Sequence, residues 1–215
     1  KASKQRLYFG NWEYDNDPAT IIGYDSIVAY WNGNHVKAEG EMYLSIDVAR
    51  KGKDKTVFRV WHGWKVIARY SMGISLINEI VDKATQLQQE YKIPNNHTVA
   101  DEDGVGGGVV DYLNCTGFVN NSRALNGENY DNLKSQCSIL MAKKINRKEV
   151  TEVCNDSDII DTTSEEMEQV KIKDIDKDSK MGVIPKDKVK DLIGRSPDEW
   201  DSIMMRYVFE FQQDF

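Results

Sequence analysis

The chain has 215 residues, of which 40% are hydrophobic and 29% charged, and its formal net charge is −7 at pH 7. This length suffices for one α/β domain with a complete core. The negative charge excludes a uniformly basic nucleic-acid coat protein. No apolar run approaches the roughly 18 residues that a membrane span needs, and no signal peptide is recognisable.

The cysteines and histidines define no structural or catalytic motif. Cys115, Cys137 and Cys154 are odd in number and lack close metal-ligand spacing, and the three histidines are scattered. We therefore expect reduced thiols and no disulfide framework. These patterns exclude a disulfide-rich secreted scaffold and a zinc module.

The first 36 residues have an irregular pattern. They predict a connector outside the core, with one short helix at 21–31. Because the chain begins with Lys1 and not with Met, we expect it to be a piece of a longer protein. The segment 1–36 would then lead into a single domain at 37–215.

From residue 41 the pattern is typical of β-strands. Runs at 41–49, 56–62 and 64–71 are separated by polar or glycine-containing turns, which predicts an antiparallel meander. In the first run, Asp47 lies on the face opposite to the regularly spaced apolar residues. A carboxylate in a central strand is costly unless it is paired. A metal ion or the amides of the following turn could provide that partner.

The next segments combine a helix, a second acid and a glycine-rich turn. Residues 72–91 have apolar side chains at helical spacing, and a short strand at 97–101 ends in Asp101. The glycine-rich turn at 104–108 lacks the Gly-Lys-Ser/Thr of a Walker loop. We interpret its glycines as allowing a tight turn that packs against the strand of Asp101, before a helix beginning near 109.

The second half of the chain alternates between strand, helix and charged sequence. A short strand is predicted at 117–120 and the longest helix at 129–150. Residues 151–180 are strongly charged and poorly periodic, and we interpret them as a flexible insertion that contains one helix or hairpin. Meander, helix, strand, helix, strand and helix together predict an α/β fold with a mixed β-sheet flanked by helices.

The closing helix carries the last candidate acids. Residues 196–199 have the pattern of a capping box with proline at the first helical position. Asp198 in the first turn is favoured by the helix dipole, whereas Asp201 has no basic partner at helical spacing. Converging carboxylates of this kind bind divalent cations. Two such ions about 4 Å apart activate water and stabilise the leaving oxygen of a phosphodiester.

Three segments carry a family resemblance. Residues 45–56, 99–106 and 194–202 together resemble the nuclease domain of tailed-bacteriophage terminase large subunits. Residues 7–12 resemble the lead-in to that domain from the packaging ATPase, so the resemblance spans nearly the whole chain. It implies an RNase H-like fold and metal-dependent endonucleolytic cutting of concatemeric viral double-stranded DNA during genome packaging.

The resemblance also implies the site residues. Asp47 and Asp101 match the first two ligands of two Mg²⁺ or Mn²⁺ ions. The third ligand matches either Asp198 or Asp201, and both stay open. Asp103 is a nearby reserve ligand that the turn would direct to solvent.

Two basic groups have different expected roles. The first is expected to contact DNA phosphates without reading sequence. It consists of Arg50, Lys51, Lys53 and Lys55. The second is expected to form a solvated helix face. It consists of Lys143, Lys144, Arg147 and Lys148.

The expected partners are double-stranded DNA and, in the full-length motor, a terminase small subunit, a portal protein and the chain's own ATPase domain. The resemblance implies a place in the host-cell cytoplasm, transiently at the procapsid portal. Two alternatives stay open. One is another RNase H-like nuclease of resolvase or transposase type, and the other is a catalytically silent docking module of the packaging motor.

Overall fold

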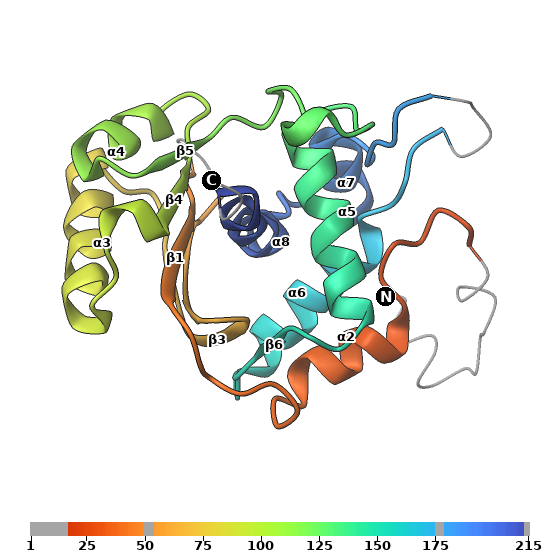
Figure 1. Cartoon of the computed structure of the whole chain (residues 1–215), viewed down its shortest axis with the longest axis horizontal. Coiled ribbons are helices and arrows are strands. Elements are labelled where there is room, and N and C mark those ends of the chain that lie inside the picture. The colour runs from red at the N-terminus through yellow and green to blue at the C-terminus, as the bar shows by residue number, and fades with distance from the viewer. Residues whose placement is uncertain (1–16, 50–53, 175–178, 213–215) are drawn as a thin grey trace.

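The computed structural model describes residues 17–49, 54–174 and 179–212. It contains six strands: β1 Met42–Asp47, β2 Thr56–His62, β3 Lys65–Met72, β4 Thr98–Asp101, β5 Thr116–Phe118 and β6 Thr151–Glu152. They form one sheet in the order β5-β4-β1-β2-β3-β6 (Figure 1). The first three strands pair antiparallel, whereas β4, β5 and β6 join their neighbours in parallel. The predicted meander and the predicted mixed sheet are therefore confirmed.

Helices cover both faces of the sheet. They are α2 Tyr24–Trp31, α3 Ile77–Tyr91, α4 Gly106–Leu113, α5 Leu133–Asn146, α6 Ser157–Gln169, α7 Lys186–Ile193 and α8 Asp198–Met204. Short 3₁₀ segments are Asn95–His97, Leu125–Gly127 and Met205–Gln212. In Figure 1, α3 and α4 lie on one side of the sheet, and α8 lies on the other side with α5 and α6 beyond it. The elements that the sequence placed start and end within a few residues of their predicted positions, apart from α3, which begins at Ile77. No position was predicted for β6, α6 or α7.

The alternation along β1 separates two hydrophobic cores. Leu44 and Ile46 pack into the core on the α3 and α4 side. Tyr43 belongs to the core on the α8 side, which also contains Trp200. Because successive side chains of a strand point to opposite faces, Asp47 lies on the same face as Tyr43. Asp47 therefore faces α8, on the side opposite to Leu44 and Ile46, as the alternation along the strand predicted.

The N-terminal helix α2 is part of the core. Ile27 and Tyr30 of α2 are 3% and 1% exposed, and the helix contacts β6, α5 and α6. The expectation that this segment lies outside the core is therefore wrong for α2, because its apolar side chains are buried. Residues 7–12 lie outside the described residues. The assignment of 1–36 as a connector to another domain stays a proposal.

Most of the charged segment 151–180 is regular structure within the described residues. It contains β6 and α6, and Glu166 and Met167 of α6 are buried. Further on, residues 171–173 pair with 182–184 as a short ribbon. The helix α6 and the ribbon agree with the helix or hairpin expected in this segment, and buried side chains join α6 to the rest of the fold. The flexibility of the segment stays a prediction.

The three cysteines are free thiols, and Cys137 is buried. Among the described residues, no helix is both long enough and apolar enough to cross a membrane.

Candidate active site

Asp47 and Asp101 are brought together by the pairing of β1 with β4. These strands are parallel neighbours in which Ile46 pairs with Ala100. The next residues, Asp47 in β1 and Asp101 in β4, therefore lie side by side where the two strands end. The turn after Asp101 packs tightly against its strand. A Cβ atom at Gly106 would lie 1.7 Å from the carbonyl oxygen of Asp101. This close approach agrees with the role predicted for the glycine-rich turn.

The helix α8 brings the other two acids to the same face. The Ser45 hydroxyl, two residues before Asp47, donates a hydrogen bond of 2.6 Å to the carbonyl oxygen of Ser202. The backbone N–H of Lys55 donates to Oδ2 of Asp198 at 3.0 Å. These bonds fix α8 against β1 and the start of β2. The helix therefore presents Asp198 and Asp201 to the edge where Asp47 ends its strand.

The predicted capping box is wrong. The α-helix begins at Asp198 with Pro197 at the N-cap position, and no side chain caps it. The Glu199 carboxylate, which should have reached back to the N-cap, instead accepts hydrogen bonds from Arg59 and Arg69. Hydrogen bonds from a charged guanidinium to a carboxylate are stronger than one from a backbone amide. The contacts with the two arginines therefore replace the local hydrogen bond to the N-cap amide.

Asp201 is held by two lysines from distant parts of the chain. Nζ of Lys134, in α5, lies 2.6 Å from Oδ1, and Nζ of Lys186, the first residue of α7, lies 2.8 Å from Oδ2. The Lys186 Nζ is also 3.7 Å from Oδ1 of Asp198. Helical spacing within α8 could not reveal these partners. Lys134 and Lys186 are site residues that the sequence analysis missed.

The electrostatics of the site reflect burial and crowded carboxylates. Burial raises the pKa of Asp47 well above its usual range, with Asp201, Asp198 and Asp101 adding to the rise and Lys186 opposing it. Burial likewise raises the pKa of Asp101 to about 6. Burial also acts to raise the pKa of Asp201, but its two lysines outweigh that effect and lower it. The cluster thus has more negative charge than its lysines neutralise.

A cleft of about 290 Å³ opens over these groups. Its lining residues include Asp47, Asp101, Asp103, Asp198 and Lys186. Within the described ranges, no three His, Cys, Asp or Glu side chains stand in the arrangement of a formed metal site. The donor set nevertheless fits a hard divalent cation, because it consists of carboxylate oxygens with uncompensated charge. In the structure, the ammonium group of Lys186 supplies a positive charge between Asp198 and Asp201.

The predicted ligands are therefore brought together, and they differ in accessibility. Asp47, Asp101 and Asp198 line the cleft. Asp201 is 3% exposed and carries a lysine on each oxygen. Asp103 is exposed and lines the cleft, and its Oδ2 accepts a hydrogen bond of 2.8 Å from Asn120.

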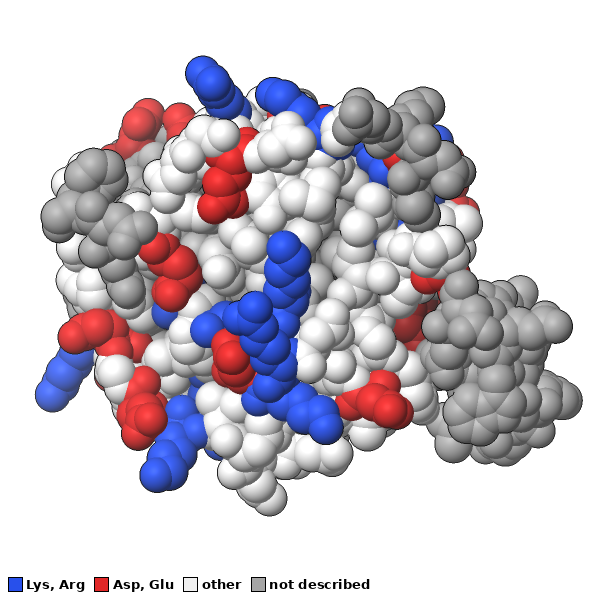
Figure 2. All heavy atoms as spheres, turned by 45° about the vertical axis from the view of Figure 1, so that its right-hand side comes forward, with Lys and Arg blue, Asp and Glu red and all other residues white. Residues whose placement is uncertain are grey.

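The basic groups lie on the surface as far as they are described. Lys55 is exposed, whereas Arg50, Lys51 and Lys53 lie outside the described residues. Figure 2 shows Lys and Arg side chains gathered around an acidic one on the side of the molecule that carries α5. At the end of α5, Lys144 pairs with Glu149 at 3.0 Å. Its neighbours Lys143, Arg147 and Lys148 are exposed, in agreement with a solvated helix face.

A buried charge network fastens α8 to the sheet. Arg59, in the middle of β2, donates 3.0 Å hydrogen bonds to the Glu152 carboxylate and to the carbonyl oxygen of Glu199, and a third of 2.8 Å to the Glu199 carboxylate. Tyr30 donates to the same Glu152 oxygen at 2.7 Å. The Arg59 side chain also contacts the Ser202 hydroxyl. This network positions the helix that carries two of the acids, and its members were not singled out from the sequence.

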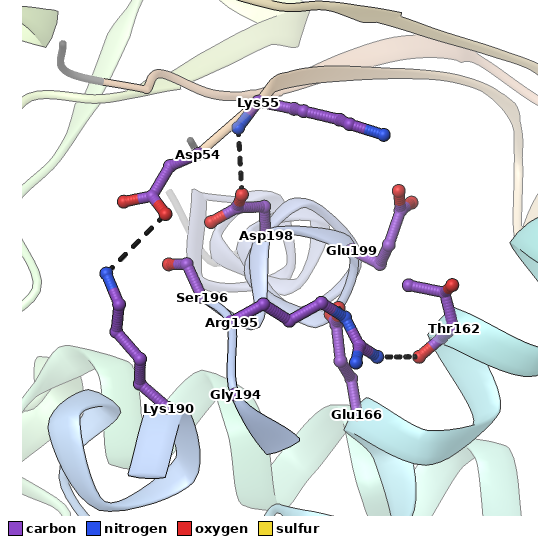
Figure 3. A pocket seen from close by; sticks show the side chains of 10 residues that line it. All are labelled: Asp54, Lys55, Thr162, Glu166, Lys190, Gly194, Arg195, Ser196, Asp198 and Glu199. Carbon is purple, nitrogen blue, oxygen red and sulfur yellow. Dashed lines mark hydrogen bonds and ion pairs between the residues drawn. The ribbon is translucent and has the colours of Figure 1, made fainter. Parts of the chain in front are cut away.

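A second cleft, of about 360 Å³, adjoins Asp198 on its other side. Figure 3 shows that its lining residues come from the two positions before β2, from α6, from α7, from the segment between α7 and α8, and from the start of α8. Burial raises the pKa of Glu166 in this cleft to about 8, although the Trp200 backbone N–H bonded to its carboxylate opposes the rise. Asp54 and Lys190 pair across the opening at 3.5 Å.

No family model and no curated protein matches the sequence. Solved structures do match. The nuclease domain of the large terminase subunit gp2 of bacterial virus Sf6 is 19% identical, with 87% of this chain and 97% of that chain covered and a TM-score of 0.75. A lysine-to-alanine variant of that domain, solved with manganese and beta-thujaplicinol, is 18% identical with the same coverage and TM-score.

A third match comes from the thermophilic phage G20c. Its large terminase nuclease, solved with bound magnesium, is 15% identical, with 89% of this chain and 98% of that chain covered and a TM-score of 0.59. At these identities the similarity establishes the fold. The chain therefore has the α/β, RNase H-like fold of phage large terminase nuclease domains, as the sequence predicted.

Proposed function

We propose that this domain is a metal-dependent endonuclease that cuts double-stranded viral DNA by two-metal-ion hydrolysis during genome packaging. One observation carries the proposal. Acids from the ends of two parallel strands and from one helix converge on a single cleft, in a fold shared with phage terminase nuclease domains. Buried carboxylates with this excess of negative charge are costly unless a cation joins them.

The proposed ligands are Asp47, Asp101 and Asp198, which would hold two Mg²⁺ or Mn²⁺ ions. Such ions lower the pKa of bound water and stabilise the leaving oxygen of a phosphodiester. The Lys55 backbone N–H holds Oδ2 of Asp198. Oδ1 of Asp198 is 3.7 Å from Lys186 Nζ, a looser contact than either oxygen of Asp201 makes with its lysine. Because lysines occupy both oxygens of Asp201, we assign this residue the task of positioning Lys134 and Lys186.

The direct test is cleavage of supercoiled plasmid in Mn²⁺, in Mg²⁺ or in EDTA. We expect nicked and linear products with either metal and none with EDTA. Because an acidic domain is expected to hold DNA weakly by itself, the same assay on a protein that includes the ATPase domain is the control. Failure of both proteins to cut at any metal concentration would contradict the proposal and favour a silent docking module.

A pair of substitutions separates the two candidate third ligands. Asp198→Asn is expected to remove measurable Mn²⁺ binding and cleavage. Asp201→Asn is expected to keep Mn²⁺ binding and to lower kcat by about 10- to 100-fold, as is usual for residues that orient a metal site from outside it. Isothermal titration with Mn²⁺ and plasmid cleavage measure the two effects. The opposite order of effects would identify Asp201 as the ligand.

The wider context is proposed on the same basis. The neighbours are domains of large terminase subunits, which supports a role beside an ATPase domain, a terminase small subunit and a portal protein in the infected cell. A resolvase-type nuclease would differ in substrate. Preferential cutting of four-way DNA junctions over linear duplex would favour that alternative.

A further inference from the structure

Two further clefts adjoin the central cleft of the candidate active site. The central cleft, which contains Asp47 and Asp101, shares Asp54 and Asp198 with the cleft drawn in Figure 3. On its other side it shares residues with a third cleft, of about 420 Å³. The shared residues are Asp103, Asn120 and Lys186. A chain-like ligand whose reacting group lies over the acids would therefore extend into one or both flanking clefts.

The third cleft has two walls that the fold holds in place. One wall is the ribbon formed by residues 171–173 and 182–184, in which the Lys173 N–H donates to the carbonyl oxygen of Gly182 at 2.9 Å. The other wall is the first turn of α5, whose N-cap Asn132 accepts from the Ser135 N–H at 2.9 Å. The Val183 N–H joins the walls by donating to the Ser135 hydroxyl at 3.2 Å. Hydrogen bonds within and between the two walls therefore fix the shape of this cleft.

The charges of the two flanking clefts differ. The cleft in Figure 3 is lined by three basic and four acidic residues: Lys55, Lys190, Arg195, Asp54, Glu166, Asp198 and Glu199. The third cleft has three lysines and one acid: Lys134, Lys173, Lys186 and Asp103. Lys134 and Lys186 share the carboxylate of Asp201, and Lys173 pairs with Asp131 at 2.6 Å. With Asp103, the three lysines are balanced by three acids, whereas the cleft in Figure 3 has one more acid than bases. A polyanion is therefore repelled less in the third cleft than in the other, and a phosphate can replace the Asp131 carboxylate at Lys173.

Amide groups add neutral hydrogen-bond donors to the third cleft. Asn120, Asn121 and Asn132 all line it. The Asn132 amide donates to Oδ1 of Asn121 at 3.3 Å. Within the described part of the chain, the NH₂ group of the exposed Asn121 donates to no protein acceptor. Lysines together with such amides are the groups that commonly bind nucleic-acid phosphates.

We propose that the third cleft binds the phosphate backbone of the DNA strand on one side of the scissile phosphate, with Lys173 and Asn121 as phosphate contacts. The inference rests on the proposed nuclease function and specifies where its substrate lies. It also gives the site a direction, because the strand leaves the acids toward α5 and the ribbon and avoids the acidic cleft beside Glu166.

The test measures binding of a fluorescein-labelled DNA duplex by anisotropy, in Ca²⁺ to prevent cutting, over a range of salt concentrations. Lys173→Ala is expected to weaken binding and to reduce the slope of log affinity against log salt by about 1, as for one lost phosphate contact. Asn121→Asp is expected to weaken binding through charge repulsion. The matched control is Lys171→Ala, because Lys171 pairs with Asp17 at 2.5 Å as Lys173 pairs with Asp131 at 2.6 Å, but Lys171 does not line the cleft.

The outcomes separate this proposal from the nuclease proposal. Equal salt slopes for Lys173→Ala and Lys171→Ala, or no binding by the unchanged protein at low salt, would overturn the cleft assignment. Binding that depends on Lys173 in a protein that never cuts DNA would keep the cleft and reject the nuclease. Cutting with kcat/KM unchanged in both cleft variants would reject the cleft and keep the nuclease. Melting curves confirm that each variant is folded.

Discussion

Asp47→Asn is expected to lower plasmid cleavage by about 10³-fold or more, because a ligated metal contributes several kcal/mol of transition-state stabilisation. The fold should be retained. Burial and three neighbouring acids raise the pKa of Asp47 in the metal-free protein, so a neutral amide of the same shape removes repulsion without removing packing. The melting temperature without metal should stay equal or rise. The stabilisation that Mn²⁺ gives the unchanged protein should disappear.

Plasmid cleavage and melting curves with Mn²⁺ or EDTA measure both parts of this prediction. Asp111→Asn is the matched control, because Asp111 is an exposed acid on α4 and does not line the central cleft. It should cut and melt like the unchanged protein. Cleavage by Asp47→Asn at the parental rate would show that the site has been assigned wrongly. A metal-dependent shift in its melting temperature would place the metal elsewhere.

The local patterns of the sequence predicted much of the sheet and of the site. Alternation along 41–49 gave both the strand and its two faces, and the face of Asp47 proved to be the one that α8 covers. The close approach at Gly106 agrees with the interpretation of the glycine-rich turn. Such features depend on neighbours within a few residues, which a single sequence displays directly.

The features that were missed depend on pairs far apart in the chain. Lys134 lies 67 residues from Asp201, and no periodicity indicates that pairing. Glu152 and Glu166 belong to the charged segment 151–180 that we interpreted as a flexible insertion, whereas both are buried with partners. In a single sequence, a charged residue that becomes buried cannot be distinguished from one that stays exposed. Its role becomes visible only when the fold brings its partner to it.

Arg59→Ala is expected to cost about 3–5 kcal/mol of unfolding free energy, as is typical when one member of a buried ion-pair network is removed. Total stabilities of small proteins are of the order of 5–15 kcal/mol, so the variant should be marginally stable. Arg59 is fully buried, and its loss leaves the carboxylates of Glu152 and Glu199 buried with fewer donors. Arg69 would still pair with Glu199, whereas Glu152 would keep only the Tyr30 hydroxyl as a hydrogen-bond donor among the described residues.

Urea unfolding of the metal-free protein measures this cost, with Arg123→Ala as the control. Arg123 is exposed, and its replacement should change the unfolding free energy by less than about 0.5 kcal/mol. Adding Glu152→Gln to Arg59→Ala should recover part of the loss, because most of the cost is the unpaired carboxylate and not the missing side chain. A loss below about 1 kcal/mol for Arg59→Ala, or a further loss on adding Glu152→Gln, would contradict this explanation. Since the same arginine holds the backbone of α8 through the Glu199 carbonyl, weaker Mn²⁺ binding should accompany the loss of stability even at temperatures where the variant is folded.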